Sequence, residues 1–180
     1  MAQDPIILII HTVGQIYAFI LILRFLLQVA GADYYNPISQ AVVRITGAPL
    51  KPLQKLLPRA GRIDLSPLLL AFVVYGLTLV AMMLVKGIAA SVPMILLYSA
   101  VTLLDSILQI YFWTVIAAVI ISWIAPDSYH PAPQLILQIT EPLFKLARKV
   151  IPPIGGLDLS PILIFLLIQI LRSQLAPFTF

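Results

Sequence analysis

Ile63-Asp64-Leu65-Ser66-Pro67 is effectively written twice in this chain, because Leu157-Asp158-Leu159-Ser160-Pro161 repeats it 94 positions later. The same spacing, applied without a gap, makes other residues coincide: Gln15-Ile16-Tyr17 with Gln109-Ile110-Tyr111, Asp33 and Pro37 with Asp127 and Pro131, and Ile45-Thr46 with Ile139-Thr140. Self-similarity at one fixed spacing is the signature of a duplicated structural unit. A period this long predicts two tandem halves of one fold and not a solenoid.

The composition predicts an integral membrane protein. Hydrophobic residues make up 61% of the 180 residues and charged residues 10%, whereas soluble domains contain about 45–50% and about 25%. A chain of this length holds about four spans of about 20 residues and leaves no room for a separate soluble domain. The absence of cysteine excludes disulfides, thiolate metal sites and covalent c-type haem attachment.

The apolar runs predict an all-α fold with four transmembrane helices, two in each half. The long run from Gly87 to Ala125 is compatible with one span or with two, and the repeat favours one because the counterpart of the first span is 99–125. The expected organisation is a first repeat over 1–86 with spans 5–31 and 63–85, a connection over 87–98, and a second repeat over 99–180 with spans 99–125 and 157–175.

Between its two spans, each repeat carries a segment with no stretch long enough to cross a membrane, at 33–62 and 127–156. In the first, Asn36-Pro37 is typical of a helix start, Gly47 is expected to break the helix, and the two prolines after it to restart it. Basic residues lie opposite an apolar stripe: Lys51 and Lys55 in the first segment, and Lys145, Arg148 and Lys149 in the second. We predict amphipathic helices in the headgroup plane, held by anionic lipid. The alternative is a helical hairpin packed on the protein's own loops.

The repeated motif is interpreted as a helix start. Ser66 is expected to be the N-cap of the second span, with Pro67 in its first turn. Asp64 is expected to accept free backbone N–H groups and to meet the positive end of the helix dipole. The same roles fall in the second repeat to Asp158, Ser160 and Pro161. An ion or proton site at the aspartates is the alternative.

Polar residues inside the spans are costly if they face lipid. The repeat spacing places four of them in pairs: His11 with Asp105, and Gln15 with Gln109. If a two-fold axis along the membrane normal relates the halves, His11 and Asp105 lie at equal depth and form a polar clamp. The alternative is that both are solvated at the external headgroup level. Two arginines are expected to extend their charge toward the nearer interface, namely Arg24 and Arg172.

The basic residues also predict the orientation. Both segments between spans carry an excess of Lys and Arg, including Arg44, Arg59 and Arg62 in the first. The positive-inside rule makes the face of these loops cytoplasmic and the termini external.

The sequence contains no enzyme motif such as a Ser-His-Asp set, HExxH or a glycine-rich phosphate loop, and no cofactor is expected. His130 stands in the position of Asn36 and is expected to cap a helix, not to bind a metal. A net charge of +4 beside apolar stripes fits a membrane surface better than nucleic acid. The expected partners are anionic lipid headgroups and a membrane protein or a second copy of the chain.

The pattern of two spans enclosing N-P…I-T-x-P-L…P…G-x-D-L-S-P, in duplicate, resembles the YggT family over essentially the whole chain. The first copy of the pattern consists of Asn36, Pro37, Ile45, Thr46, Pro49, Pro58, Gly61 and Asp64 to Pro67. The second consists of Pro131, Ile139, Thr140, Pro142, Leu143, Pro152, Gly155 and Asp158 to Pro161. The first copy departs from the pattern by Ala48 before Pro49, and the second by His130 in the asparagine place.

The resemblance implies a small protein of the bacterial inner membrane, with relatives in cyanobacteria and plastids, and no agreed reaction. Roles proposed across the family include osmotic or ion homeostasis, cell division and nucleoid organisation, and assembly of haem-carrying membrane complexes. We therefore expect a non-enzymatic scaffold in envelope or osmotic homeostasis. The alternatives are a small ion channel or transporter subunit and, third, an assembly factor for a membrane complex or cofactor.

Overall fold

The computed structural model is built from helices and describes residues 4–57, 63–89, 91–125, 128–153 and 158–179. Along the chain these helices are α1 (Pro5–Val29), α2 (Pro37–Leu56), α3 (Ser66–Val85), α4 (Val92–Ile124), α5 (Pro131–Val150), α6 (Ser160–Leu175) and the 3₁₀ turn η1 (Ala176–Phe178). Four described helices, α1, α3, α4 and α6 with its 3₁₀ turn, are long and apolar enough to cross a membrane. The predicted fold of four transmembrane helices with helices between the spans of each repeat is confirmed.

The duplication extends to the ends of the helices. Helix α5 begins and ends 94 positions after α2, and α6 begins 94 positions after α3. Helix α4 differs, because it starts at Val92, seven residues before the counterpart of Pro5. The expected connection over 87–98 is therefore too long: Pro93 lies in the first turn of α4, where its missing N–H costs nothing. The turn before α4 contains Gly87 at φ +66°, a conformation that favours glycine.

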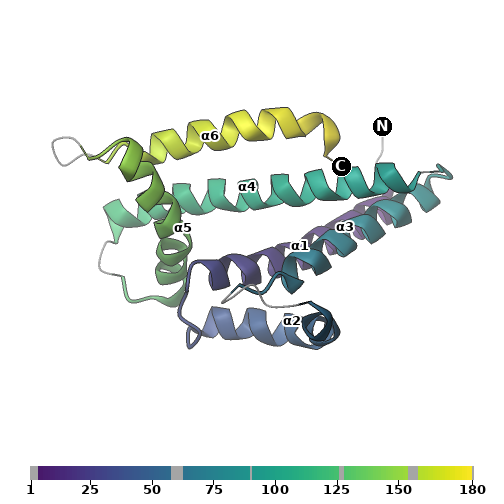
Figure 1. The fold of residues 1–180 in the computed structure, drawn as a ribbon, viewed down its shortest axis with the longest axis horizontal. Coiled ribbons are helices and arrows are strands. Elements are labelled where there is room, and N and C mark those ends of the chain that lie inside the picture. The colour runs from purple at the N-terminus through teal and green to yellow at the C-terminus, as the bar shows by residue number, and fades with distance from the viewer. Residues whose placement is uncertain (1–3, 58–62, 90, 126–127, 154–157, 180) are drawn as a thin grey trace.

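Helix α2 runs without a break through Gly47, Pro49 and Pro52, which corrects the expectation of two shorter helices. Thr46 and Leu50, on either side of the expected break, are fully buried, and their packing holds this stretch helical against its local preference. The prolines bend the helix, which changes direction toward its C-terminal end (Figure 1).

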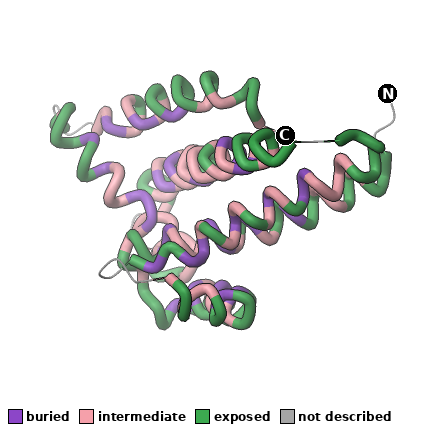
Figure 2. The backbone as a smooth tube through the Cα atoms, turned by 45° about the vertical axis from the view of Figure 1, so that its right-hand side comes forward, coloured by how far each residue is buried: buried purple, intermediate pink, exposed green. Residues whose placement is uncertain are grey.

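The four spans pack in the order α1, α3, α4 and α6, with α3 in contact with both α1 and α4. Helices α1 and α3 lie side by side, α4 and α6 lie side by side, and the chain termini are at the end of the molecule opposite the turns that lead into α2 and α5 (Figure 1). A Cβ atom added to Gly14 of α1 would lie 2.1 Å from Oγ1 of Thr78 in α3. This close approach is the small-residue packing on which membrane helices depend. Exposed residues line the outer faces of the spans (Figure 2), as expected for surfaces that meet lipid.

Two clusters of buried side chains form the core. The first centres on Ala18, Leu21 and Ile22 of α1 and joins α2, α3 and residues of the second repeat, and the second joins α4, α5 and α6 around Val115 and Phe144. Hydrogen bonds also link the repeats: Asn36 Nδ2 donates to Pro131 O at 2.9 Å, the N–H of Asp33 donates to Gln138 Oε1 at 3.1 Å, and the hydroxyls of Tyr75 and Ser106 lie 2.7 Å apart. The turn before α2 is therefore hydrogen-bonded to α5.

Candidate functional site

The aspartate of the repeated motif holds the start of the second span in each repeat. Asp64 Oδ1 accepts the N–H of Ser66 at 2.9 Å, and Asp158 Oδ1 accepts the N–H of Ser160 at the same distance. The prediction that the aspartates accept free backbone N–H groups is confirmed, whereas the expectation that Ser66 and Ser160 are N-caps is wrong, because the N-cap positions are Leu65 and Leu159. The reason is that the residue after each aspartate already has helical dihedral angles, so the serine and the proline after it lie inside the first turn.

The second carboxylate oxygen distinguishes the repeats. In the first repeat, Asp64 Oδ2 accepts Nε2 of Gln54 at 2.6 Å. In the second repeat, Arg148 stands in the position of Gln54, and its Nε and Nη2 both lie 2.9 Å from Asp158 Oδ2. One aspartate is therefore ion-paired by the protein itself, while the other is held by a neutral amide.

Both carboxyl groups are ionised at neutral pH. Burial acts to raise the pKa of Asp64, but hydrogen bonds from Ser66 and Gln54 and the charge of Arg24 outweigh it, so the pKa is lowered. For Asp158, burial also acts to raise the pKa, and hydrogen bonds from Ser160 and Arg148 together with the arginine charge lower it overall. Hydrogen bonding to the charged form has this effect in general.

Arg24 is half-buried, and its guanidinium extends from α1 to α2, the helix expected at the membrane surface. Its Nη1 donates to Oγ1 of Thr46 at 2.6 Å and to the carbonyl of Val43 at 3.2 Å. Helix α2 thus supplies hydrogen-bond acceptors for this charge, which the apolar end of α1 lacks. The counterpart of Arg24 in the second repeat is Ala118.

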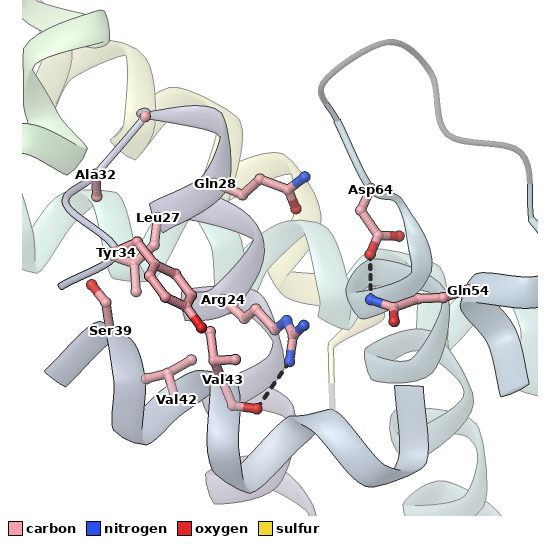
Figure 3. Close-up of a pocket in the computed structure, with 11 residues that line it drawn as sticks. Arg24, Leu27, Gln28, Ala32, Tyr34, Ser39, Val42, Val43, Gln54 and Asp64 are labelled. Carbon is pink, nitrogen blue, oxygen red and sulfur yellow. Dashed lines mark hydrogen bonds between the residues drawn. The ribbon is translucent and has the colours of Figure 1, made fainter. Parts of the chain in front are cut away.

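A cavity of about 510 Å³ lies between the end of α1, the turn after it, α2 and the Asp64 motif. Arg24 and Asp64 reach this cavity from different elements, with Gln54 beside the carboxylate (Figure 3). The remaining residues around it are Leu27, Gln28, Gly31, Ala32, Tyr34, Ser39, Val42 and Val43. Among the described residues, Oγ of Ser39 has no hydrogen-bond partner, although this side chain is only 5% exposed.

The four polar residues paired by the repeat separate into two sets. Gln15 and Gln109 line a second cavity of about 390 Å³, where the hydroxyls of Tyr75 and Ser106 lie 2.7 Å apart. Asp105 is bound by Arg172 of α6, with Nε at 2.7 Å from Oδ1 and Nη2 at 3.2 Å from Oδ2. The carboxylate expected to pair with the half-buried His11 is thus held by an arginine.

The same ion pair corrects the expectation for Arg172. Its guanidinium matches the carboxylate with two parallel hydrogen bonds, and charged residues within membrane spans commonly pair with one another. The position equivalent to Arg172 in the first repeat is Thr78, the residue in close contact with Gly14. The ion pair and the close contact are therefore alternative solutions to packing two spans.

The lysines of the basic faces are solvent-exposed, whereas Arg148 forms an ion pair within the protein. Lys51 and Lys55 on α2 and Lys145 and Lys149 on α5 are exposed. Arg148 binds Asp158 and lies over the ring of Phe144 at 5.4 Å. Several residues named in the sequence patterns lie outside the described residues: Pro58, Arg59, Gly61, Arg62, Asp127, Gly155 and Leu157.

His130 precedes α5, but its side chain makes no capping hydrogen bond, in contrast to Asn36, whose Oδ1 accepts the N–H of Ile38 at 2.9 Å. His130 therefore occupies the predicted N-cap position of α5 without making the capping hydrogen bond; the short asparagine side chain has the reach that caps require. In the described part of the chain, no group of three His, Asp or Glu residues is arranged to hold a metal ion.

Comparison with known proteins agrees with this two-repeat architecture. The model of the CCB3/YggT family matches twice, over residues 3–85 and 97–179. The chain belongs to the CCB3/YggT family. The two matches correspond to the two structural repeats, each with its Asp-Leu-Ser-Pro motif.

Relatives in the CCB3/YggT family share most of the chain. An uncharacterized protein of Pseudomonas aeruginosa is 41% identical over 167 residues, which cover 92% of this chain and 85% of that protein. The uncharacterized protein YggT of Escherichia coli strain K12 is 30% identical over 174 residues, covering 97% of this chain and 90% of that protein. The uncharacterized protein ycf19 of Guillardia theta is 38% identical over 63 residues, 34% of this chain and 69% of that protein. No solved structure matches the chain.

Proposed function

We propose that this chain is a non-enzymatic scaffold of the bacterial inner membrane that holds a membrane-protein partner or a second copy of itself, in envelope or osmotic homeostasis. The observation that supports this most is the cavity with Gln15 and Gln109. Both amides are exposed, one from each repeat, and they meet at a surface that also exposes Phe19 and Trp113. Amide groups are costly toward lipid, and hydrogen bonds between helices are a common way to satisfy them.

The second candidate, an ion channel or transporter subunit, is favoured by the same polar cavity. Conduction through one chain requires a continuous polar path. Between the glutamine cavity and the Arg24–Asp64 cavity, helices α1 and α3 place four fully buried apolar residues: Ala18, Leu21, Ile22 and Ala71. This apolar layer separates the two cavities and favours the scaffold. An assembly factor for a membrane complex is a special case of the scaffold, with a partner that carries a cofactor.

We also propose that α2 and α5 lie at the cytoplasmic surface, with the termini external. The exposed residues Arg44, Lys51, Lys55, Lys145 and Lys149 support this orientation by the positive-inside rule. They also support binding of anionic headgroups, each near such a surface contributing about 1 kcal/mol.

Pull-down of the tagged full chain in mild detergent, followed by mass spectrometry, tests the scaffold. We expect a stoichiometric membrane-protein partner or a homo-oligomer, and loss of this association in the Gln15→Leu, Gln109→Leu double variant. Gln169→Leu is the matched control, because Gln169 is an exposed glutamine on α6, away from the cavity. A wild-type chain that purifies alone and conducts ions in vesicles establishes the channel instead.

A further inference from the structure

The two repeats differ in the residue that binds the motif aspartate. As a result, the cavity of the first repeat is lined by one positive and one negative side chain, Arg24 and Asp64. In the second repeat, Arg148 neutralises Asp158 directly at 2.9 Å. In the first repeat, the same position is the neutral Gln54, so the ionised Asp64 receives hydrogen bonds but no ion pair from the described residues. Arg24 lines the same cavity, and its two hydrogen bonds go to uncharged oxygens of α2.

Both charged groups retain capacity for a ligand. A guanidinium has five N–H donors, and within the described part of the chain both hydrogen bonds of Arg24 use Nη1, which leaves Nε and Nη2. Each oxygen of Asp64 accepts one hydrogen bond and has a second lone pair. Ser39 adds a buried hydroxyl that has no partner among the described residues.

We propose that this cavity binds the headgroup of a zwitterionic phospholipid with a primary amine, a phosphoethanolamine group, with its phosphate on Arg24 and its ammonium on Asp64. The arginine offers paired N–H donors, the geometry that phosphate oxygens prefer. The carboxylate offers acceptors to the N–H donors of the ammonium. The volume of about 510 Å³ lies within the range of about 300–1,000 Å³ that is typical of small-molecule sites.

The charge balance of the cavity selects this class of headgroup. A purely anionic headgroup gains Arg24 but has no positive charge for Asp64: the hydroxyls of phosphatidylglycerol can donate only neutral hydrogen bonds, and the net negative charge of the lipid is repelled by the carboxylate. A purely cationic ligand gains Asp64 but is opposed by Arg24. A zwitterion satisfies both groups and brings no net charge into a half-buried site, where an unpaired charge is costly.

The position of the cavity favours a lipid over a soluble zwitterion. Arg24 is on a membrane span and Asp64 comes directly before another, so the site lies where headgroups lie. Leu27, Val42 and Val43 form an apolar side of the cavity, suited to the glycerol and the first acyl carbons of a lipid.

Native mass spectrometry of the purified full chain, titrated with phosphatidylethanolamine, phosphatidylcholine or phosphatidylglycerol of equal acyl chains, tests the proposal. We expect at least about tenfold tighter binding of phosphatidylethanolamine, because choline has no N–H donors for Asp64 and charge-assisted hydrogen bonds contribute on this order. The Arg24→Gln variant should lose this preference. So should Gln54→Arg, which gives Asp64 the ion pair that Asp158 already has and is therefore expected to fold.

The matched control is Arg148→Gln, which changes the second repeat in the opposite sense and should leave the preference unchanged. Equal binding of the three lipids, or a preference that survives in Gln54→Arg, overturns the proposal. Equal loss in Arg148→Gln also overturns it, because the effect then does not belong to this cavity. Free phosphoethanolamine should not displace the lipid at equal concentration; displacement identifies the ligand as a soluble zwitterion and overturns the lipid assignment.

Discussion

The ion pair between Asp105 and Arg172 joins α4 to α6 and gives a quantitative prediction about stability. The side chains are 16% and 27% exposed, and two hydrogen bonds connect them. Removing one partner by Asp105→Leu or Arg172→Met leaves the other charge without its partner. Breaking a buried pair costs about 3–5 kcal/mol, and the partial exposure reduces the expected loss of unfolding free energy to about 2–3 kcal/mol for each variant.

Replacing both residues should cost far less than the sum of the single losses. An apolar pair of similar volume is often neutral relative to a buried ion pair, so we expect the double variant to lie within about 1 kcal/mol of the wild type. The coupling energy is then at least about 3 kcal/mol, the upper end for neighbouring residues.

The assay is equilibrium unfolding by sodium dodecyl sulfate in mixed micelles, followed by helical circular dichroism. A coupling energy below about 0.5 kcal/mol would refute the ion pair. The comparison cycle is His11→Ala with Asp105→Leu, which should be nearly additive. If the coupling appears there instead, the aspartate pairs with His11 across the repeats.

Three further predictions concern other parts of the fold. The free energy of unfolding should fall as the pH drops below about 4, because the pKa of Asp64 and Asp158 is lowered in the folded protein and the unfolded chain therefore binds protons first. The Asp64→Asn variant should show a weaker pH dependence. A pH profile unchanged in this variant would contradict the prediction. Gly14→Ala should lower the free energy of unfolding by about 1–3 kcal/mol, because the added methyl group overpacks against Thr78. Gly47 has open space around it, so Gly47→Ala should stabilise α2 by up to about 1 kcal/mol. Equal effects of the two substitutions in thermal unfolding would disprove the close contact. Replacing Lys51, Lys55, Lys145 and Lys149 by Gln should weaken the binding of anionic lipid to the detergent-solubilised protein by about 1 kcal/mol per residue and leave membrane insertion intact. Loss of insertion would show that these lysines are structural.

The sequence predicted those parts of the fold that depend on local patterns. Apolar run length and the repeat spacing located the spans, and the motif located the starts of α3 and α6 to within a few residues. The continuity of α2 through Gly47 was not predictable in this way, because burial of Thr46 and Leu50 overrides the local preference. The start of α4 does not follow from local pattern, because a proline such as Pro93 is as common in the first turn of a helix as in a connection.

The hydrogen-bond partners of the charged residues could be identified only from the structure. Arg24 and Arg172 each find acceptors on another helix, and nothing in their own neighbourhood in the sequence identifies those helices. The sequence did contain one sign that the repeats differ: the residue ten positions before the motif aspartate is Gln54 in the first copy and Arg148 in the second. Comparison of these two positions would have suggested that the repeats differ in how they balance the aspartate charge.

A parallel arrangement of the two repeats underlies the orientation, the basic surface and the headgroup site, and its most direct test is accessibility of single cysteines. The chain has no cysteine, so Lys55→Cys, Lys149→Cys and the control Ser91→Cys each introduce one reactive thiol, in α2, in α5 and just before α4. With a membrane-impermeant maleimide on intact cells and on inverted vesicles, we predict that Lys55→Cys and Lys149→Cys are labelled only from the cytoplasmic side, and Ser91→Cys only from outside. Labelling of Lys55→Cys and Lys149→Cys from opposite sides would contradict the parallel repeats and establish an inverted repeat.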